Sequence, residues 1–203
     1  MTDHLRERMD EIVRDYNDTD PDSVQRIREP IDGTAFFPGG HGLWRSAHPH
    51  GQMPQQFPEK SIMLVGHNFD SVQRYGWSVK RGIEVMKWPT WRNTRAYISY
   101  ADLTEEQCFF TNALMGLQPK ASRGMLRATD LFRAECLTFL GEQIAIIRPK
   151  AVIALGKESS QQIAALSPAV PVLNLLHPLA ALRHASLAQS EGRRLGQFLA
   201  NLN

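Results

Sequence analysis

Four short, continuous runs of apolar residues constrain the fold of this chain more than any other feature. The runs are SIMLV (61–65), CFFT (108–111), AVIAL (151–155) and VPVLNLL (170–176), with longer stretches between them. A continuous run, unlike an alternating one, is typical of a strand that is buried on both faces. The pattern therefore predicts an α/β protein with three layers, α/β/α, around a central sheet of four parallel strands.

Helical patterns lie between and after these runs. Apolar residues recur at helical spacing from Leu131 to Ile147, and Pro149 stops the pattern just before the third strand. A shorter helix is expected after Gly156 and a terminal one over 187–202. By contrast, residues 30–60 contain five prolines together with GG and HPHG, which predicts a long loop.

The length of 203 residues, 42% of them hydrophobic, is enough for one hydrophobic core, so we expect a single domain over 1–203. Within it, helical spacing over residues 1–16 followed by NDTDPD predicts an N-terminal helical appendage at 1–22. None of the apolar runs approaches the roughly 20 residues that cross a bilayer. The charged N-terminus lacks the apolar core of a secretory signal. We therefore expect a cytoplasmic protein without membrane contact. We also expect it to be a monomer.

The net charge of +2 conceals an asymmetry along the chain. Residues 1–22 carry eight acids and three bases (net −5), which leaves 13 acids and 20 bases (net +7) for the rest. Six of those bases, against the single acid Glu84, fall between residues 72 and 95: Arg74, Lys80, Arg81, Lys87, Arg92 and Arg95. Such a cluster is typical of a phosphate-facing surface, and a solvated helix face is the simpler interpretation.

Two cysteines, Cys108 and Cys136, are too few for a disulfide framework or a four-thiolate metal site, and both fall on apolar patterns. We expect them in the core, with no cofactor and no metal bound. A metal-dependent hydrolase that uses four histidines is a weak alternative, because their spacing matches no usual ligand pattern. Those histidines are His41, His48, His50 and His67.

Ligands of an open parallel sheet bind beyond the carboxyl ends of its strands, where loops and helix N-termini converge. The residues at those positions are Gly66 to Asp70 after the first strand, Asn112 after the second, Gly156 after the third, and His177 with Pro178 after the fourth. An amide can match a nucleobase edge, an aromatic ring can stack on its face, and a histidine can stabilise a departing anion. The same residues also serve as turn formers. A nucleophile elbow, GxGxxG and a P-loop are all missing.

Five blocks in order resemble the uracil-DNA glycosylase superfamily across most of residues 60–185. MLVGHNFDS resembles the first active-site motif, CFFTNAL the second strand with its base-reading asparagine, and LLHPLAALR the second active-site motif. TWRNT (90–94) is similar to the helix entering the second strand, and FLGEQIAIIRPKAVIALGKES (139–159) to the segment before the last strand. The resemblance implies the uracil-DNA glycosylase fold. It also implies an enzyme that removes uracil, or a related deaminated or damaged base, from single- or double-stranded DNA in base excision repair.

The resemblance also assigns roles, residue by residue. Asn68, following Gly66, would hold the attacking water, and His177 would stabilise the uracil anion, with Pro178 opening the loop that enters DNA. The flipped base would stack on Phe69 and be read by Asn112. The remaining implied site residues are His67, Asp70, Gly156 and Arg183, the last placed to hold phosphate or fill the gap left by the base.

The first motif departs from the branches of the family that carry Asp or Glu there, since this chain has His67 and Asn68. An amide cannot take a proton, so Asp70 or His67 would have to supply the base. The iron-sulfur branches need four cysteines and this chain has two. Because the first motif lacks a clear catalytic base, the main alternative is a catalytically weak or inactive nucleic-acid-binding protein of the same fold.

Overall fold

The computed structural model describes residues 25–26, 41–42, 61–68, 71–81, 87–117, 128–182 and 184–202. The expected N-terminal helix and nearly all of the Gly/Pro-rich segment lie outside these residues, so both stay predictions, as does the one-domain organisation. None of the helices in the described ranges is long and apolar enough to cross a membrane.

The central sheet is parallel, and its strands lie in the order β2-β4-β3-β6-β7. The four predicted strands are confirmed as β3 (Ile62–Gly66), β4 (Cys108–Asn112), β6 (Ala151–Leu155) and β7 (Val172–Leu175). A fifth, two-residue strand, β2 (His41–Gly42), adds to the outer edge of β4, from within the segment expected to be loop. Two residues are too few to produce a sequence pattern.

Burial explains how closely the apolar runs match the strands. β4 and β6 are buried at every residue and β3 at all but its last, whereas β7 is only partly buried because it forms an edge of the sheet. The run from Val170 to Leu176 is accordingly longer than the strand, and Leu176 itself is exposed.

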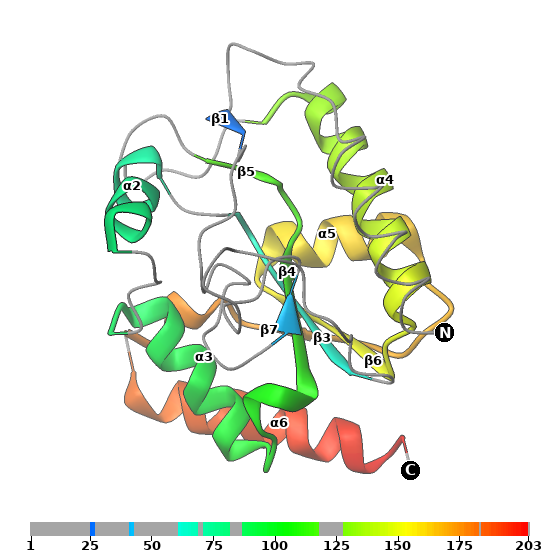
Figure 1. Ribbon diagram of the computed structural model, residues 1–203. Coiled ribbons are helices and arrows are strands. Elements are labelled where there is room, and N and C mark those ends of the chain that lie inside the picture. Colours follow the sequence, from blue (N-terminus) through cyan, green and yellow to red (C-terminus); the bar gives the residue numbers. More distant parts are fainter. Residues whose placement is uncertain are drawn as a thin grey trace.

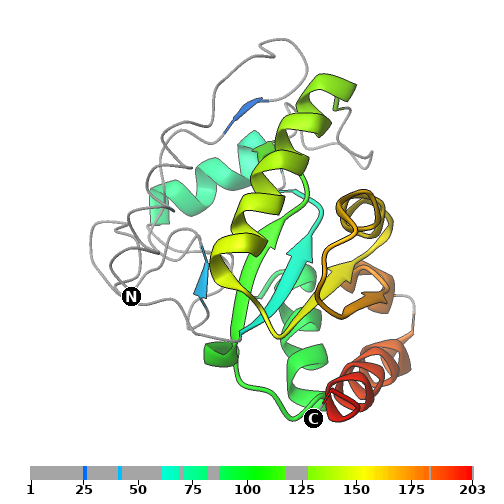
Figure 2. The same ribbon diagram turned by 90° about the vertical axis from the view of Figure 1, so that its right-hand side faces the viewer.

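Helices cover both faces of the sheet and complete the expected α/β/α layers (Figure 1). On one face, α3 (Pro89–Tyr100) packs along α6 (Ala185–Ala200). On the other lie α4 (Asp130–Ile147) and α5 (Lys157–Leu166), as the turned view in Figure 2 shows. This arrangement follows from right-handed crossovers, because the chain moves from β3 to β4 in one direction and returns past β3 to β6 and β7.

The smaller elements lie around this core. α2 (Val72–Arg81) follows β3, and η1 (Glu105–Gln107) precedes β4. β1 (Gln25–Arg26) and β5 (Gly116–Leu117) form a separate antiparallel pair. η2 (Pro178–Leu182) connects β7 to α6.

The predicted stripe of α4 forms the inner face of that helix, with Phe132, Cys136 and Leu140 fully buried. The hydroxyl of Thr129 accepts the Phe132 N–H and caps its start, and Arg148, in a left-handed conformation before Pro149, ends it. Leu131, which the spacing placed on the stripe, is exposed in the first turn. Cys108 is fully buried like Cys136, so both cysteines are core residues as expected.

Candidate active site

β3 and β4 end side by side, since Gly66 of β3 pairs in register with Asn112 of β4. The two exits are locked together: the Ala113 N–H donates to Gly66 O and the Leu114 N–H to His67 O, both at 2.9 Å. A Cβ on Gly66 would lie 2.4 Å from Asn112 Oδ1. Glycine at this position therefore makes room for the amide of Asn112.

β6 and β7 also end side by side. The Gly156 N–H donates to Leu175 O at 2.9 Å, and a Cβ on Gly156 would lie 2.9 Å from His177 Cβ. Gly156 has φ +99° and ψ −179°, a conformation that only glycine adopts without strain. The glycine turn thus lets the His177 ring approach the backbone after β6.

Two buried polar atoms at these strand ends have no hydrogen-bond partner in the described part of the chain. They are Asn112 Nδ2 and His67 Nε2. Asn112 is only 3% exposed, so its amide hydrogens are shielded from water as well. Because an unmatched buried donor costs about 1–3 kcal/mol, such groups are typical of a site completed by a ligand.

The electrostatics of the site favour neutral imidazoles. Burial, with smaller contributions from His177 and Arg133, lowers the pKa of His67 to about 4. Burial also lowers the pKa of His177. The Leu179 N–H donates to His177 Nδ1 at 3.2 Å, so the neutral ring carries its proton on Nε2. The His177 Nε2–H is consequently available as a donor to a ligand.

An ion pair that the sequence motifs did not indicate borders the site. Arg133 of α4 pairs with Glu158, which is buried in the first turn of α5, where the helix dipole favours a carboxylate. The charge of Arg133 reaches His67, as its effect on the His67 pKa shows. The available sequence signals were a basic residue at the start of the α4 stripe and the presence of Glu158 in the 139–159 block.

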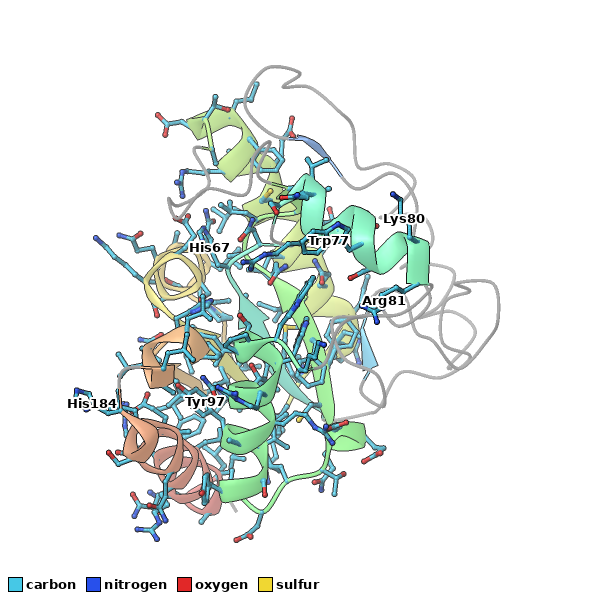
Figure 3. All side chains as sticks on the ribbon, turned by 90° about the vertical axis from the view of Figure 1, so that its left-hand side faces the viewer. His67, Trp77, Lys80, Arg81, Tyr97 and His184 are labelled. Carbon is cyan, nitrogen blue, oxygen red and sulfur yellow. The ribbon has the colours of Figure 1, made fainter. Side chains whose placement is uncertain are left out.

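Side chains of α3 and α6, on the other face of the sheet, hold the segment around His177 in place. Asn93 Nδ2 donates to Pro178 O at 2.8 Å and the Tyr97 hydroxyl to Leu176 O at 3.3 Å, while the Leu176 N–H donates to Glu191 Oε2 at 2.7 Å. Figure 3 shows Tyr97 between α3 and the segment that leads into α6. All three side chains are buried polar groups of helices. Sequence reasoning missed them, although Asn93 belongs to the TWRNT block.

The structure thus brings together most of the residues expected at the site: Gly66, His67, Asn112, Gly156, His177 and Pro178. Asn68 follows them in the loop after β3 and is partly buried. Phe69, Asp70 and Arg183 lie outside the described residues, so their expected roles stay predictions. Groups of three or more His, Cys, Asp or Glu side chains that could hold a metal ion do not occur within the described ranges, which exclude His48 and His50.

The basic cluster after β3 differs in part from the expectation. Arg95 forms an ion pair of 2.7 Å with Glu105, so its charge is largely matched within the protein. The Arg74 guanidinium lies over the Trp88 ring, 5.6 Å from its centroid. Lys80, Arg81 and Arg92 are exposed.

Comparison with known proteins agrees with the fold. No curated protein matches the chain. The model of the uracil DNA glycosylase superfamily matches residues 26–200. That range includes every described strand except part of β1, and both motifs that flank the site. At family level it implies a DNA glycosylase type of hydrolase. The chain belongs to the uracil DNA glycosylase superfamily.

Proposed function

We propose that this protein is a DNA glycosylase that flips uracil, or a related deaminated or damaged base, out of DNA and hydrolyses its N-glycosidic bond. The observation that carries the proposal is the pair of buried, unpartnered groups at neighbouring strand ends, Asn112 Nδ2 and His67 Nε2. A flipped uracil offers carbonyl oxygens to such a donor. In this proposal Phe69 stacks on the base.

His177 supplies the largest catalytic contribution. As the C1′–N bond breaks, its electron pair stays on the base, so negative charge develops on the uracil ring. The Leu179 N–H donates to His177 Nδ1, which keeps the ring proton on Nε2. This Nε2–H donates to the developing negative charge. Because burial keeps the ring neutral, the donor is present throughout the neutral pH range.

Water completes the reaction by adding its oxygen to C1′, and the base anion finally takes up the proton that the water releases. Asn68 orients this water in the proposed mechanism. Its amide cannot accept the proton, and a ring whose pKa is about 4 makes His67 a weak base. Asp70 is the remaining candidate in the motif, and without it the chemical step is slow.

The segment after His177 is suited to contact DNA. Leu179 and Leu182 of η2 are 44% and 54% exposed, beside the buried Pro178. Exposed apolar side chains next to a base pocket can fill the gap that the flipped nucleotide leaves in the stack. Arg183 would bind phosphate at the end of the same segment.

The alternative is a nucleic-acid-binding protein that keeps the fold without catalysis. The absence of a carboxylate from residues 61–68 and the low pKa of His67 favour it. Both proposals predict DNA binding, so binding alone does not separate them.

Excision from defined oligonucleotides tests the proposal. Single- and double-stranded DNA with one uracil, hypoxanthine or xanthine, and with mismatched uracil, is incubated with the protein and treated with alkali. Strand breaks at the uracil are expected. His177→Ala should lower single-turnover excision about 10²–10³-fold while DNA affinity changes little. His184→Ala, an exposed histidine at the start of α6 (Figure 3), is the matched control. DNA that is bound but remains intact with every base would support the alternative.

A further inference from the structure

The outer face of α2 displays an exposed tryptophan among cations. Trp77 is 49% exposed, although tryptophan is mostly buried in folded proteins. Arg74, Lys80 and Arg81 are also exposed, three or four residues from Trp77 along the helix. That spacing places all four side chains on one face of the helix, which we term the α2 face.

The described residues of α2 and α3 carry no acidic side chain. Residues 71–81 and 87–100 contain neither Asp nor Glu, and they add the exposed cations Lys87 and Arg92. Arg74 lies over the Trp88 ring, which joins α2 to the start of α3. The α2 face is therefore a positively charged surface with one exposed aromatic ring, and it complements a polyanion with accessible flat groups.

The position of α2 connects this face to the candidate active site. α2 begins at Val72, four residues after Asn68, and lies beyond the carboxyl ends of β3 and β4 (Figures 1 and 2). His67 and Trp77 lie at the same end of the molecule (Figure 3), and Lys80 and Arg81 are exposed in the last turn of α2. Trp77 is five residues, roughly 7.5 Å, along the helix axis from Val72. This length is about that of two stacked nucleotides, at about 3.4 Å each.

We infer that the α2 face binds unpaired DNA beside the flipped nucleotide, with a neighbouring base stacked on Trp77 and its phosphates held by Lys80 and Arg81. An unpaired strand fits better than a duplex because bases inside a duplex have both faces covered, so only the cations would be used. Aromatic stacking and backbone cations together are typical of single-strand binding. The inference rests on the proposed function only for the location of the flipped base.

The test measures binding of the full-length protein to a uracil-free oligonucleotide, single-stranded or in a duplex of the same sequence, over a range of salt concentrations. Trp77→Ala should weaken single-strand binding about tenfold and duplex binding less than about twofold. Trp77→Phe should restore most of the single-strand affinity. Tyr100→Ala, which removes a similarly exposed aromatic from the far end of α3, should change neither.

A second variant examines the cations. The double substitution Lys80→Gln and Arg81→Gln should reduce the slope of log affinity against log salt by about 1.4 for the single strand, as two lost phosphate contacts require. Equal losses for single strand and duplex in Trp77→Ala, or no loss in either, would overturn the inference, as would an unchanged salt slope. Because the probe contains no uracil, a protein without glycosylase activity can still show the expected binding. A negative binding result would overturn this inference alone and would not bear on the excision test of the proposed function.

Discussion

The side-chain amide of Asn93 on α3 donates a hydrogen bond of 2.8 Å to the backbone carbonyl of Pro178, 85 residues further along the chain. With Tyr97 and Glu191, it fixes the strand exit that carries His177 from the far side of the sheet. Glu191 is itself held by Arg194 at 2.6 Å. The position of the proposed catalytic histidine thus depends on helices that contribute no group to the candidate active site.

Asn93→Asp should lower single-turnover excision by about tenfold or more, because a carboxylate facing the Pro178 carbonyl replaces an attractive contact with a repulsive one worth about 1–3 kcal/mol. The effect should appear in kcat, with DNA affinity close to that of the unaltered protein. Asn201→Asp, at the exposed end of α6, serves as control. Excision at the original rate by a folded Asn93→Asp protein would show that this tie does not position His177.

Asn112→Asp should impair uracil excision by about five- to hundredfold, because a second acceptor replaces the NH₂ group that faces the uracil carbonyl. Cytosine, which presents a donor there, should be tolerated weakly. Gly66→Ala should have a similar effect, since its Cβ would meet Asn112 Oδ1 at 2.4 Å and displace the amide. Excision assays are paired with melting temperatures. If Asn112 only caps a turn, Asp serves as well and uracil excision stays undiminished.

The stability of the protein should fall on acidification from about pH 6.5 to pH 4. In this window the unfolded chain binds a proton that folded His67, with its pKa of about 4, does not, so the free energy of unfolding decreases as pH falls. The lowered pKa of His177 acts in the same direction. For His67 we expect a loss of about 2 kcal/mol, measured by urea unfolding at several pH values.

His67→Asn should flatten this pH dependence, and Arg133→Gln should flatten it partly, because the charge of Arg133 contributes to the lowered pKa of His67. The same slope in His67→Asn as in the unaltered protein would mean that His67 titrates normally in the folded state.

Gly156→Ala should destabilise the protein by about 1–3 kcal/mol and reduce excision, because the backbone conformation is strained for alanine. The new Cβ would also lie 2.9 Å from His177 Cβ. Gly76→Ala is a control of opposite sign: its Cβ would meet no atom within 4 Å, so alanine in the middle of α2 should stabilise by about 0.5–1 kcal/mol. Thermal unfolding of both variants measures the difference, and equal melting temperatures would contradict the strained conformation at Gly156.

The sequence by itself determined the family and four of the five strands of the central sheet; β2 is too short to leave a pattern. Strands buried on both faces require continuous apolar runs, so β6 coincides with its run, β4 extends one residue beyond its run, and β3 is displaced by one residue. The rule that parallel strands end at one edge was sufficient to bring Gly66 beside Asn112 and Gly156 beside His177. These features are local patterns combined with one general rule of topology.

Only the tertiary structure decided which polar side chains support the site and which charges remain available. Asn93 and Glu191 look like ordinary helix residues in any local window, and their partners lie in the segment after β7 that packing brings to them. Arg95 belongs to the basic cluster in sequence, yet Glu105 pairs with it once α3 and η1 are in place. Hydrogen bonds and ion pairs between distant segments depend on the positions of both partners, and those positions exist only after the core has packed.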